Sequence, residues 1–244
     1  IMKRVSLLLV GVLIIGSVSA QQLDTLFRAS SQATDNAAWT PDGNHLLFTA
    51  NFSGNWQVYI RDLTTKKVTR LTHHEGNDEN PLCSPDGMRI VFSSERDGNQ
   101  DLWIMDVDGK NQRKLLNWKS NEMHPTWHPN GQEILFNSNK DDTTGIAIYT
   151  LKLNSGETKR LTDPAQAKTY AQWSPDGTMI VYVKWTSFEN STRDICLMDA
   201  SGGGEVHLTS NPAHLNGWPS WAPDGKEVVF SSYETGNFQL YSIG

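Results

Sequence analysis

The sequence predicts an all-β protein, a β-propeller of four-stranded antiparallel blades, and three observations support this prediction. A motif of Trp or Cys, a variable residue, Pro, Asp or Asn, and Gly occurs five times. Its period, roughly 40 to 50 residues, is typical of a propeller in which each repeat forms one blade. Hydrophobic runs also recur at similar distances behind each motif. We call the first residues of the motifs the anchors: Trp39, Cys83, Trp127, Trp173 and Trp221.

Each repeat contains further predicted strands. Runs such as RIVF and MIVY predict a buried strand. They end on an aromatic residue nine positions after every anchor: Phe48, Phe92, Phe136, Tyr182 and Phe230. A third strand is predicted at the next hydrophobic run of each repeat, centred on Tyr59, Trp103, Tyr149, Cys196 and Tyr241. A fourth strand is predicted shortly before the next anchor, around Leu71, Leu115, Leu161 and Leu208.

The Pro-Asp-Gly part of the motif predicts a tight hairpin turn. Pro presets φ, Asp or Asn hydrogen-bonds nearby backbone, and Gly takes the left-handed position. A single blade cannot bury both of its faces, and the anchor Trp is expected to fill the space between neighbouring sheets. Repetition around a ring supplies the neighbours that each blade needs.

The two ends of the chain predict how the ring closes. Phe27 stands as far before the first anchor as Leu71 stands before Cys83, so the segment 23–29 is predicted as a fourth strand. The sequence ends after a third strand, FQLYSI. We expect the N-terminal strand to complete the last blade and close a ring of five, since an open ring would expose blade edges. The alternative is a truncated part of a six-bladed or larger propeller.

Residues 1–20 are predicted to be a cleavable secretory signal peptide. Lys3 and Arg4 precede an apolar run over residues 5–15, and the small-residue stretch GSVSA ends at Ala20. Cleavage is expected before Gln21. The apolar run is too short to span a bilayer. The mature chain, 21–244, is therefore expected to be a single, monomeric propeller domain without membrane insertion, in the periplasm or secreted.

Charge and cysteine content exclude several classes of protein. The whole chain has a net charge of −6, and loss of Lys3 and Arg4 leaves 19 basic against 27 acidic residues, a net charge of about −8. Such a balance disfavours a nucleic-acid partner. The two cysteines exclude a disulfide framework. Cys83 and Cys196 replace aromatic residues in blades that are not neighbours, so we expect free, buried thiols.

The closest match to a known repeat is CSPDGMRIVFSSERDGNQDLWIMDVDGKNQRKL, residues 83–115. This pattern resembles the WD-type repeats of the TolB family, the periplasmic propellers of the bacterial Tol system, over nearly all of residues 22–244. The resemblance is specific for the repeat and weak for function, because similar repeats form the propellers of some serine peptidases. TolB itself is expected to have six blades and a separate N-terminal domain. The five repeats found here depart from that pattern.

A binding surface is predicted on the face that carries the loops joining strands four to one and two to three. Aromatic residues outside the repeated slots map to that face: Trp56, Trp118, Trp185, Trp218 and Phe188. The positions three before the anchors vary between blades and are expected at the inner mouth: Asn36, Asn80, His124, Tyr170 and Trp218. Aromatic residues are enriched at interface centres. The alternative is that these side chains are packed under their loops, or are variable loop ends.

Neither a catalytic nor a metal site is predicted. His124 and His128 lie about 13 Å apart along a strand and on opposite faces, too far to share an ion. HHEGNDE at 73–79 is interpreted as a solvated acidic loop, and DVDG at 106–109 as a hairpin. Motifs of serine hydrolases, phosphate-binding loops and zinc proteases do not occur. Asp35, Glu79 and Glu122 near the channel mouth keep a glycan-hydrolysing propeller open as an alternative.

From these observations we expect a non-enzymatic secreted or periplasmic scaffold, without a cofactor, that binds a protein partner of the cell envelope across its loop-rich face. Two alternatives stay open. One is a glycan-binding or glycan-hydrolysing propeller. The other is the propeller portion of a larger hydrolase such as a serine peptidase.

Overall fold

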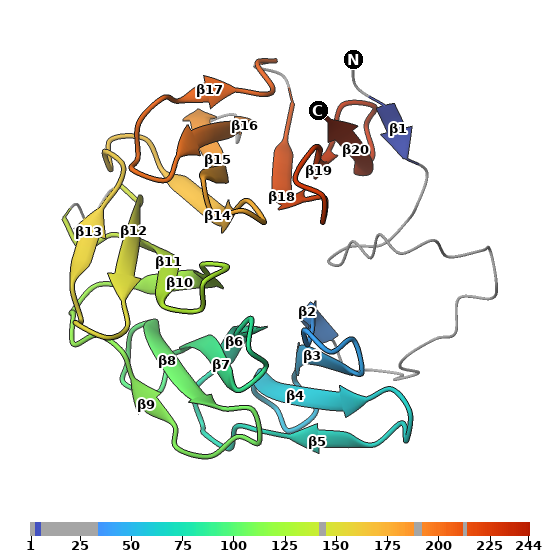
Figure 1. Cartoon of the computed structure of the whole chain (residues 1–244), viewed down its shortest axis with the longest axis vertical. Helices are drawn as coiled ribbons and strands as arrows, with labels where there is room; N and C mark the ends of the chain where they lie inside the picture. The colour runs from blue at the N-terminus through green and yellow to red at the C-terminus, as the bar shows by residue number, and fades with distance from the viewer. Residues whose placement is uncertain (1–2, 6–33, 142–144, 188–191, 212–213) are drawn as a thin grey trace.

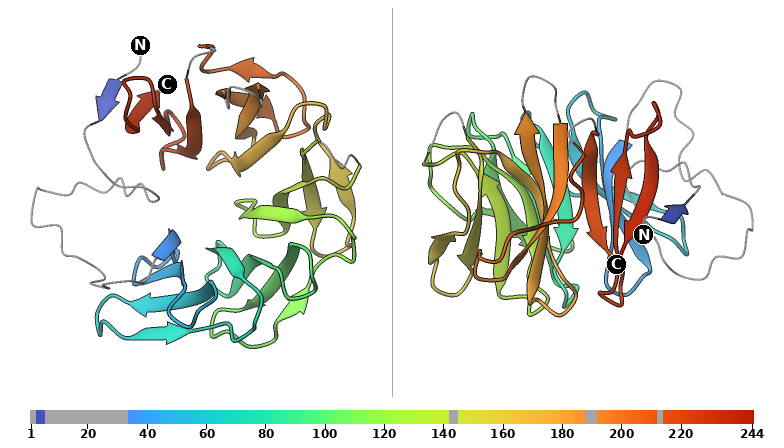
Figure 2. Two further views of the ribbon diagram at one scale, coloured as in Figure 1. Left: turned by 180° about the vertical axis from the view of Figure 1, so that it is seen from behind. Right: turned by 90° about the horizontal axis from the view of Figure 1, so that it is seen from above.

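Five four-stranded antiparallel sheets form a β-propeller, which confirms the predicted fold (Figure 1). The structure is a computed structural model that describes residues 3–5, 34–141, 145–187, 192–211 and 214–244. The described residues contain no α-helix, and hence none long and apolar enough to cross a membrane. In the view from above, the strands of successive sheets stand upright beside one another (Figure 2).

The first four blades run from an inner strand to an outer strand in sequence order, and the last blade does so through its first three strands. The inner strands end at the anchors: β2 (Thr34–Trp39), β6 (Asp78–Cys83), β10 (Glu122–Trp127), β14 (Lys168–Trp173) and β18 (Asn216–Trp221). The second strands follow the Pro-Asp-Gly turn: β3 (His45–Ala50), β7 (Arg89–Ser94), β11 (Glu133–Ser138), β15 (Met179–Ser187) and β19 (Val228–Ser232).

The outer half of each blade is a longer third strand and a short fourth strand. The third strands are β4 (Gln57–Asp62), β8 (Asp101–Asp106), β12 (Ala147–Lys152), β16 (Thr192–Asp199) and β20 (Gln239–Ile243). The fourth strands of the first four blades are β5 (Val68–Arg70), β9 (Arg113–Lys114), β13 (Thr158–Arg160) and β17 (Val206–His207).

The core lies between neighbouring blades and is built from the repeated aromatic positions. The aromatic residue nine positions after each anchor is directly opposite the central residue of the third strand, as in Phe136 and Tyr149. The Phe136 and Tyr149 rings stack with centroids 5.6 Å apart, and both side chains are buried. Trp127, an anchor, packs into the same cluster together with Val91 of the preceding blade. The anchor therefore helps to fill the space between two sheets, as predicted.

A strand near the N-terminus occupies the fourth place in the last blade. β1 (Lys3–Val5) pairs antiparallel with β20, with Lys3 opposite Ser242. This strand falls within the predicted signal peptide, so the cleavage predicted before Gln21 would remove it. The closing strand predicted at 23–29 lies outside the described residues. Inner strands pack against one another from β2 through β6, β10 and β14 to β18. In the described part of the chain β18 and β2 lack such extensive packing, and they flank an opening in the arc (Figure 1).

Both cysteines are buried and free, which confirms their predicted state. Burial raises the pKa of the Cys83 thiol to about 11 and that of Cys196 to about 12. Both thiols therefore stay protonated at neutral pH, so they act as small apolar groups.

Candidate functional site

Every inner strand contains the same irregularity near its start. The pairing with the second strand shifts register across two residues, for example between Thr169 and Gln172 in β14. Such a β-bulge bends the strand and redirects a side chain. The first residue of each bulge has a positive φ of 50° to 54°, and these are the five variable positions: Asn36, Asn80, His124, Tyr170 and Trp218.

The backbone at these positions carries strain in the blades with large side chains. Asn tolerates a left-handed conformation, whereas Tyr170 and Trp218 are outliers there. The cost of a left-handed non-Gly residue is about 1–2 kcal/mol. Strain of this kind persists where the surrounding structure holds it, and it concentrates at functional sites.

Aromatic rings form a continuous line across the third, fourth and fifth blades. The ring centroids of His124 and Tyr170 lie 4.3 Å apart, and those of Tyr170 and Trp218 lie 5.9 Å apart. Phe238 follows at 6.0 Å from Trp218, and Tyr233 at 5.2 Å from Phe238. We call these five residues the aromatic run. It leads from the partly buried inner strands to the exposed loop between β19 and β20.

The outer end of the aromatic run is open to solvent. The exposed fractions are 49% for Trp218, 44% for Phe238 and 43% for Tyr233. Contiguous exposed apolar surface of this kind marks a binding surface more often than scattered residues do. Sequence reasoning missed Phe238 and Tyr233. The predicted third strand FQLYSI starts at Phe238, whereas β20 begins at Gln239, so Phe238 and Tyr233 both lie in the loop between strands two and three. An aromatic residue in that loop, on the predicted face, was the signal that could have found them.

The aromatic run is uncharged at neutral pH. Burial lowers the pKa of His124 to about 4, so its imidazole is neutral. Burial also raises the pKa of the Tyr170 hydroxyl above its ordinary value. The run therefore presents rings rather than charges to a ligand.

Arg193, at the start of β16, adds a cation next to the aromatic run. Its guanidinium carbon lies 4.9 Å from the ring centroid of Trp185 and 5.8 Å from that of Trp218. Contacts of this length are cation–π interactions. The predicted site residue Trp185 is thus linked to Trp218 through Arg193, a residue that sequence reasoning did not select.

The opposite side of the mouth is acidic. Asp35 and Glu79 directly precede Asn36 and Asn80 on the inner strands of the first two blades. The pKa of Glu79 is raised, chiefly by burial and then by the charges of Glu95 and Asp35. The mouth therefore has aromatic and cationic character on the last three blades and negative charge on the first two.

The remaining predicted site residues lie apart from the aromatic run. Trp118 packs on the third blade, with its ring centroid 5.8 Å from that of Phe136 and 5.6 Å from that of Tyr149. The Nζ of Lys140 lies 4.3 Å from the Trp118 ring centroid. Phe188 lies outside the described residues.

Glu122, one of the three carboxylates considered for glycan hydrolysis, does not form an accessible pair with Asp35 or Glu79. The Glu122 side chain is fully buried at the start of β10, where its Oε1 accepts hydrogen bonds from Ser120 Oγ at 2.5 Å and Ser138 Oγ at 3.2 Å. Burial raises its pKa to about 7. The described residues contain no cluster of three or more His, Cys, Asp or Glu side chains that could hold a metal ion.

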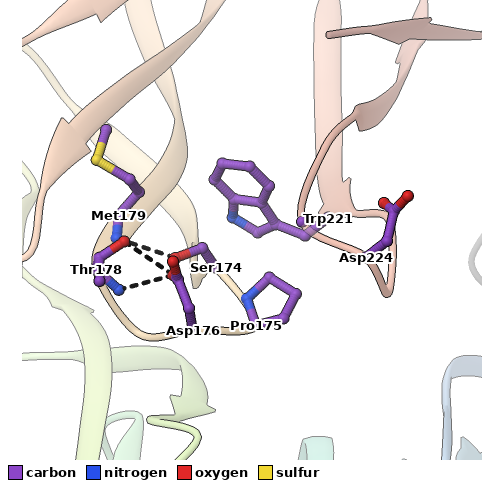
Figure 3. A pocket seen from close by; sticks show the side chains of 8 residues that line it. Ser174, Pro175, Asp176, Thr178, Met179, Trp221 and Asp224 are labelled. Carbon is purple, nitrogen blue, oxygen red and sulfur yellow. Dashed lines mark hydrogen bonds between the residues drawn. The ribbon is translucent and has the colours of Figure 1, made fainter.

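A small cavity of about 160 Å³ lies on the opposite face, between the turns of the fourth and fifth blades (Figure 3). Its walls include the repeated turn residues Ser174 and Asp176, with Trp221 from the next blade. Ser174 Oγ donates to Asp176 Oδ1 at 2.5 Å, and Asp176 also accepts from the Thr178 backbone N–H. These polar groups close the hairpin, so the cavity follows from the repeated turn.

A second cavity, of about 220 Å³, lies between the third and fourth blades. The Nζ of Lys168 donates there to the carbonyl oxygens of Asp163 and Gln166, and Lys184 pairs with Glu205. Both lysine ammonium groups in this cavity thus have partners within the chain.

Comparison with known proteins identifies the family of the propeller. The family model of the TolB beta propeller domain matches residues 13–101 and 81–244. An Agrobacterium tumefaciens protein assigned to TolB is 22% identical with a TM-score of 0.74, over 88% of this chain and 74% of that one. TolB from Acinetobacter baumannii is 23% identical with a TM-score of 0.67, over 86% of this chain and 54% of that one. No curated protein matches.

Enzymes also share the fold. An oligogalacturonate lyase solved in complex with manganese is 20% identical with a TM-score of 0.65, over 84% of this chain and 60% of that one. This chain therefore spans from about half to three-quarters of the length of these three structures, and at such identities the likeness shows the fold alone. The family model, by contrast, covers most of the sequence. The chain belongs to the TolB beta propeller domain family.

Proposed function

We propose that this protein is a non-enzymatic propeller of the cell envelope that binds a protein partner through its loop-bearing face. The observation that carries this proposal is the aromatic run, which ends in three exposed rings, Trp218, Phe238 and Tyr233. Trp and Tyr are enriched among the few residues that dominate the binding energy of protein interfaces.

The rings are held in place before a partner arrives. Tyr170 and Trp218 project from bulges of inner strands, so their backbone is fixed by the sheet. Each ring also contacts the next one along the aromatic run. Rigid aromatic side chains lose little conformational entropy on binding, which favours affinity.

The location and the non-enzymatic role are part of the same proposal. The predicted signal peptide favours export, and two of the similar structures are TolB proteins. Glu122, one of the three carboxylates considered for hydrolysis, is buried and hydrogen-bonded within its own blade, which favours a structural role for it. Cell fractionation tests the location, and recovery of the protein in the cytoplasm alone would contradict it.

Site-specific cross-linking tests the binding surface. A photoreactive amino acid at Tyr233 is expected to capture a discrete envelope protein in cells. The same amino acid at Met88, which is exposed on the opposite face of the second blade, is the matched control. Trp218→Ala should abolish the cross-link at position 233. Equal capture at both positions, or capture unaffected by Trp218→Ala, would reject this surface.

A glycan ligand is the second candidate, because one of the similar structures is an oligogalacturonate lyase and because the charge of Asp35 acts on the Tyr170 hydroxyl at the mouth. Calorimetry with oligogalacturonate distinguishes the two. Binding that is lost in Trp218→Ala would favour the glycan, and product formation abolished by Glu79→Gln would favour an enzyme.

A further inference from the structure

We propose that Arg193 is a carboxylate-binding subsite beside the aromatic run, so that the partner presents an acidic group there and an apolar side chain to Trp218. This inference rests on the proposed function and specifies the chemistry of the partner segment. The acidic group is either an Asp or Glu side chain or a C-terminal carboxylate.

Two other arginines in the described part of the chain lie over an indole ring, and a comparison with them supports this inference. Arg96 lies 4.2 Å from the Trp103 ring centroid, and its Nη2 is 3.0 Å from Asp78 Oδ2. Arg89 lies 5.1 Å from the Trp127 ring centroid, and its Nη2 is 3.8 Å from Asp86 Oδ2. Each of these two cations has a carboxylate from this chain.

Arg193 also lies over indole rings, but it differs from Arg96 and Arg89 in its acidic partner. It lies over both Trp185 and Trp218, yet no ion pair joins it to an acidic side chain among the described residues. Its Nε is buried and has no hydrogen-bond partner there. Burial lowers its pKa, although a guanidinium remains protonated in proteins. A buried donor without a partner costs free energy that a ligand can recover.

The backbone holds this guanidinium in position. The Arg193 N–H donates to the His214 carbonyl oxygen at 3.3 Å, and the Arg193 carbonyl oxygen accepts from Asn216 Nδ2 at 3.0 Å. Gly217 adjoins the guanidinium, since a Cβ there would lie 3.9 Å from Arg193 Nη1. The planar fork of an arginine matches a carboxylate through two parallel hydrogen bonds.

Charge on the far side of the mouth gives the partner segment a direction. Asp35 and Glu79 stand on the first two blades, and the charge of Asp35 contributes to the raised pKa of Tyr170 across the mouth. A segment whose acidic group binds Arg193 can therefore place a basic group toward Asp35. This arrangement favours a peptide over a neutral glycan.

Selection from random heptapeptide libraries tests the subsite with the full chain. One library displays free C-termini and the other embeds the heptapeptides within a longer chain. The wild type should select acidic residues next to aromatic or aliphatic ones. A requirement for free C-termini would identify the terminal carboxylate, and selection from the embedded library would identify side chains.

The selected peptides are then measured against variants. Arg193→Gln should weaken binding about 10- to 100-fold, as expected for a charge-assisted hydrogen bond. Arg193→Lys should recover only part of the affinity, because an ammonium lacks the fork. Replacing the acidic residue of the peptide by its amide should have no further effect in Arg193→Gln. Circular dichroism checks that both variants are folded.

The outcomes separate this subsite from the proposed function. Peptides that need Trp218 but carry no acidic residue would overturn the Arg193 subsite and leave the binding surface intact. Failure of both libraries to yield peptides that need Trp218 would overturn both. If Arg193→Gln does not fold, the subsite still requires that wild-type affinity falls with ionic strength and with amidation of the acidic residue, and constancy of both would reject it.

Discussion

Tyr170 and Trp218 occupy the same bulge position on neighbouring inner strands, and their ring centroids lie 5.9 Å apart. Both residues have left-handed backbone, with φ of 54° and 50°. A shared backbone irregularity thus brings unlike side chains of successive blades into one row. The contact depends on the ring arrangement of the blades, since a whole repeat separates the two residues in the sequence.

The left-handed backbone at Trp218 predicts an unusual order of stabilities. Trp218→Gly should be more stable than Trp218→Ala by about 1 kcal/mol, because Gly adopts positive φ without the Cβ penalty. Elsewhere in a strand Ala is the better residue. Urea denaturation of the two variants measures the difference in the free energy of unfolding, and a more stable Ala variant would show that the strain is absent.

Buried Glu122 predicts a pH dependence of stability. Its pKa is about 7 when folded and has an ordinary value of 4.5, so the folded chain holds this proton more tightly. Stability from this group is therefore full below pH 4.5 and falls as the pH rises toward 7. One pKa unit corresponds to about 1.4 kcal/mol, so the difference between 4.5 and about 7 corresponds to an expected loss of about 3–4 kcal/mol.

Glu122→Gln tests this dependence because the amide stays neutral. The variant should exceed the wild type in stability at pH 8 and match it near pH 4.5. Denaturant titrations at both pH values measure the two differences. A constant difference between the proteins would contradict a raised pKa.

The indole N–H of Trp127 predicts a stability difference between two anchors. Trp127 Nε1 donates to the Leu82 carbonyl oxygen of the preceding blade at 3.0 Å, whereas Trp173 Nε1 has no such partner among the described residues. Trp127→Phe should therefore cost about 1 kcal/mol more than Trp173→Phe, which is the matched control for ring size. Equal costs by thermal or urea unfolding would show that the hydrogen bond contributes nothing.

The turn glycines predict a contrast between two equivalent positions. Gly177 and Gly87 have similar positive φ of 74° and 76°. A Cβ on Gly177 would lie 2.6 Å from His128 Nε2, whereas nothing lies within 4 Å of one on Gly87. Gly177→Ala should thus lower the melting temperature more than Gly87→Ala. The double variant Gly177→Ala, His128→Ala should remove the excess, and its persistence would assign the excess to another cause.

Much of the fold could be predicted from the sequence because its signals are local and repeated. The turn motif and the aromatic residue nine positions later located the first two strands of every blade, as Trp127 and Phe136 show. The pairing of Phe136 with Tyr149 follows from hairpin geometry. The fourth strand of the last blade was harder to predict, because it comes from the N-terminal part of the chain and is far in sequence from β20. The structure describes only β1 (Lys3–Val5) at this place.

The candidate site was predicted only in part. The variable position three before each anchor selected His124, Tyr170 and Trp218, which the structure brings together. A separate criterion, aromatic residues outside the repeated positions, added Trp118 to the predicted surface, but its ring packs on Phe136 and Tyr149 instead. Composition and spacing do not distinguish an aromatic residue that covers its own blade from one that faces the mouth.

The sequence by itself determined the five repeats, most of their strands and the positions at which the repeats diverge, because the turn and strand signals lie within a single repeat. Only the tertiary structure decided that Arg193 lies over Trp185 and Trp218, and that Phe238 and Tyr233 extend the aromatic run. These contacts depend on the twist of each sheet and on the packing between blades, which join residues that are distant along the chain.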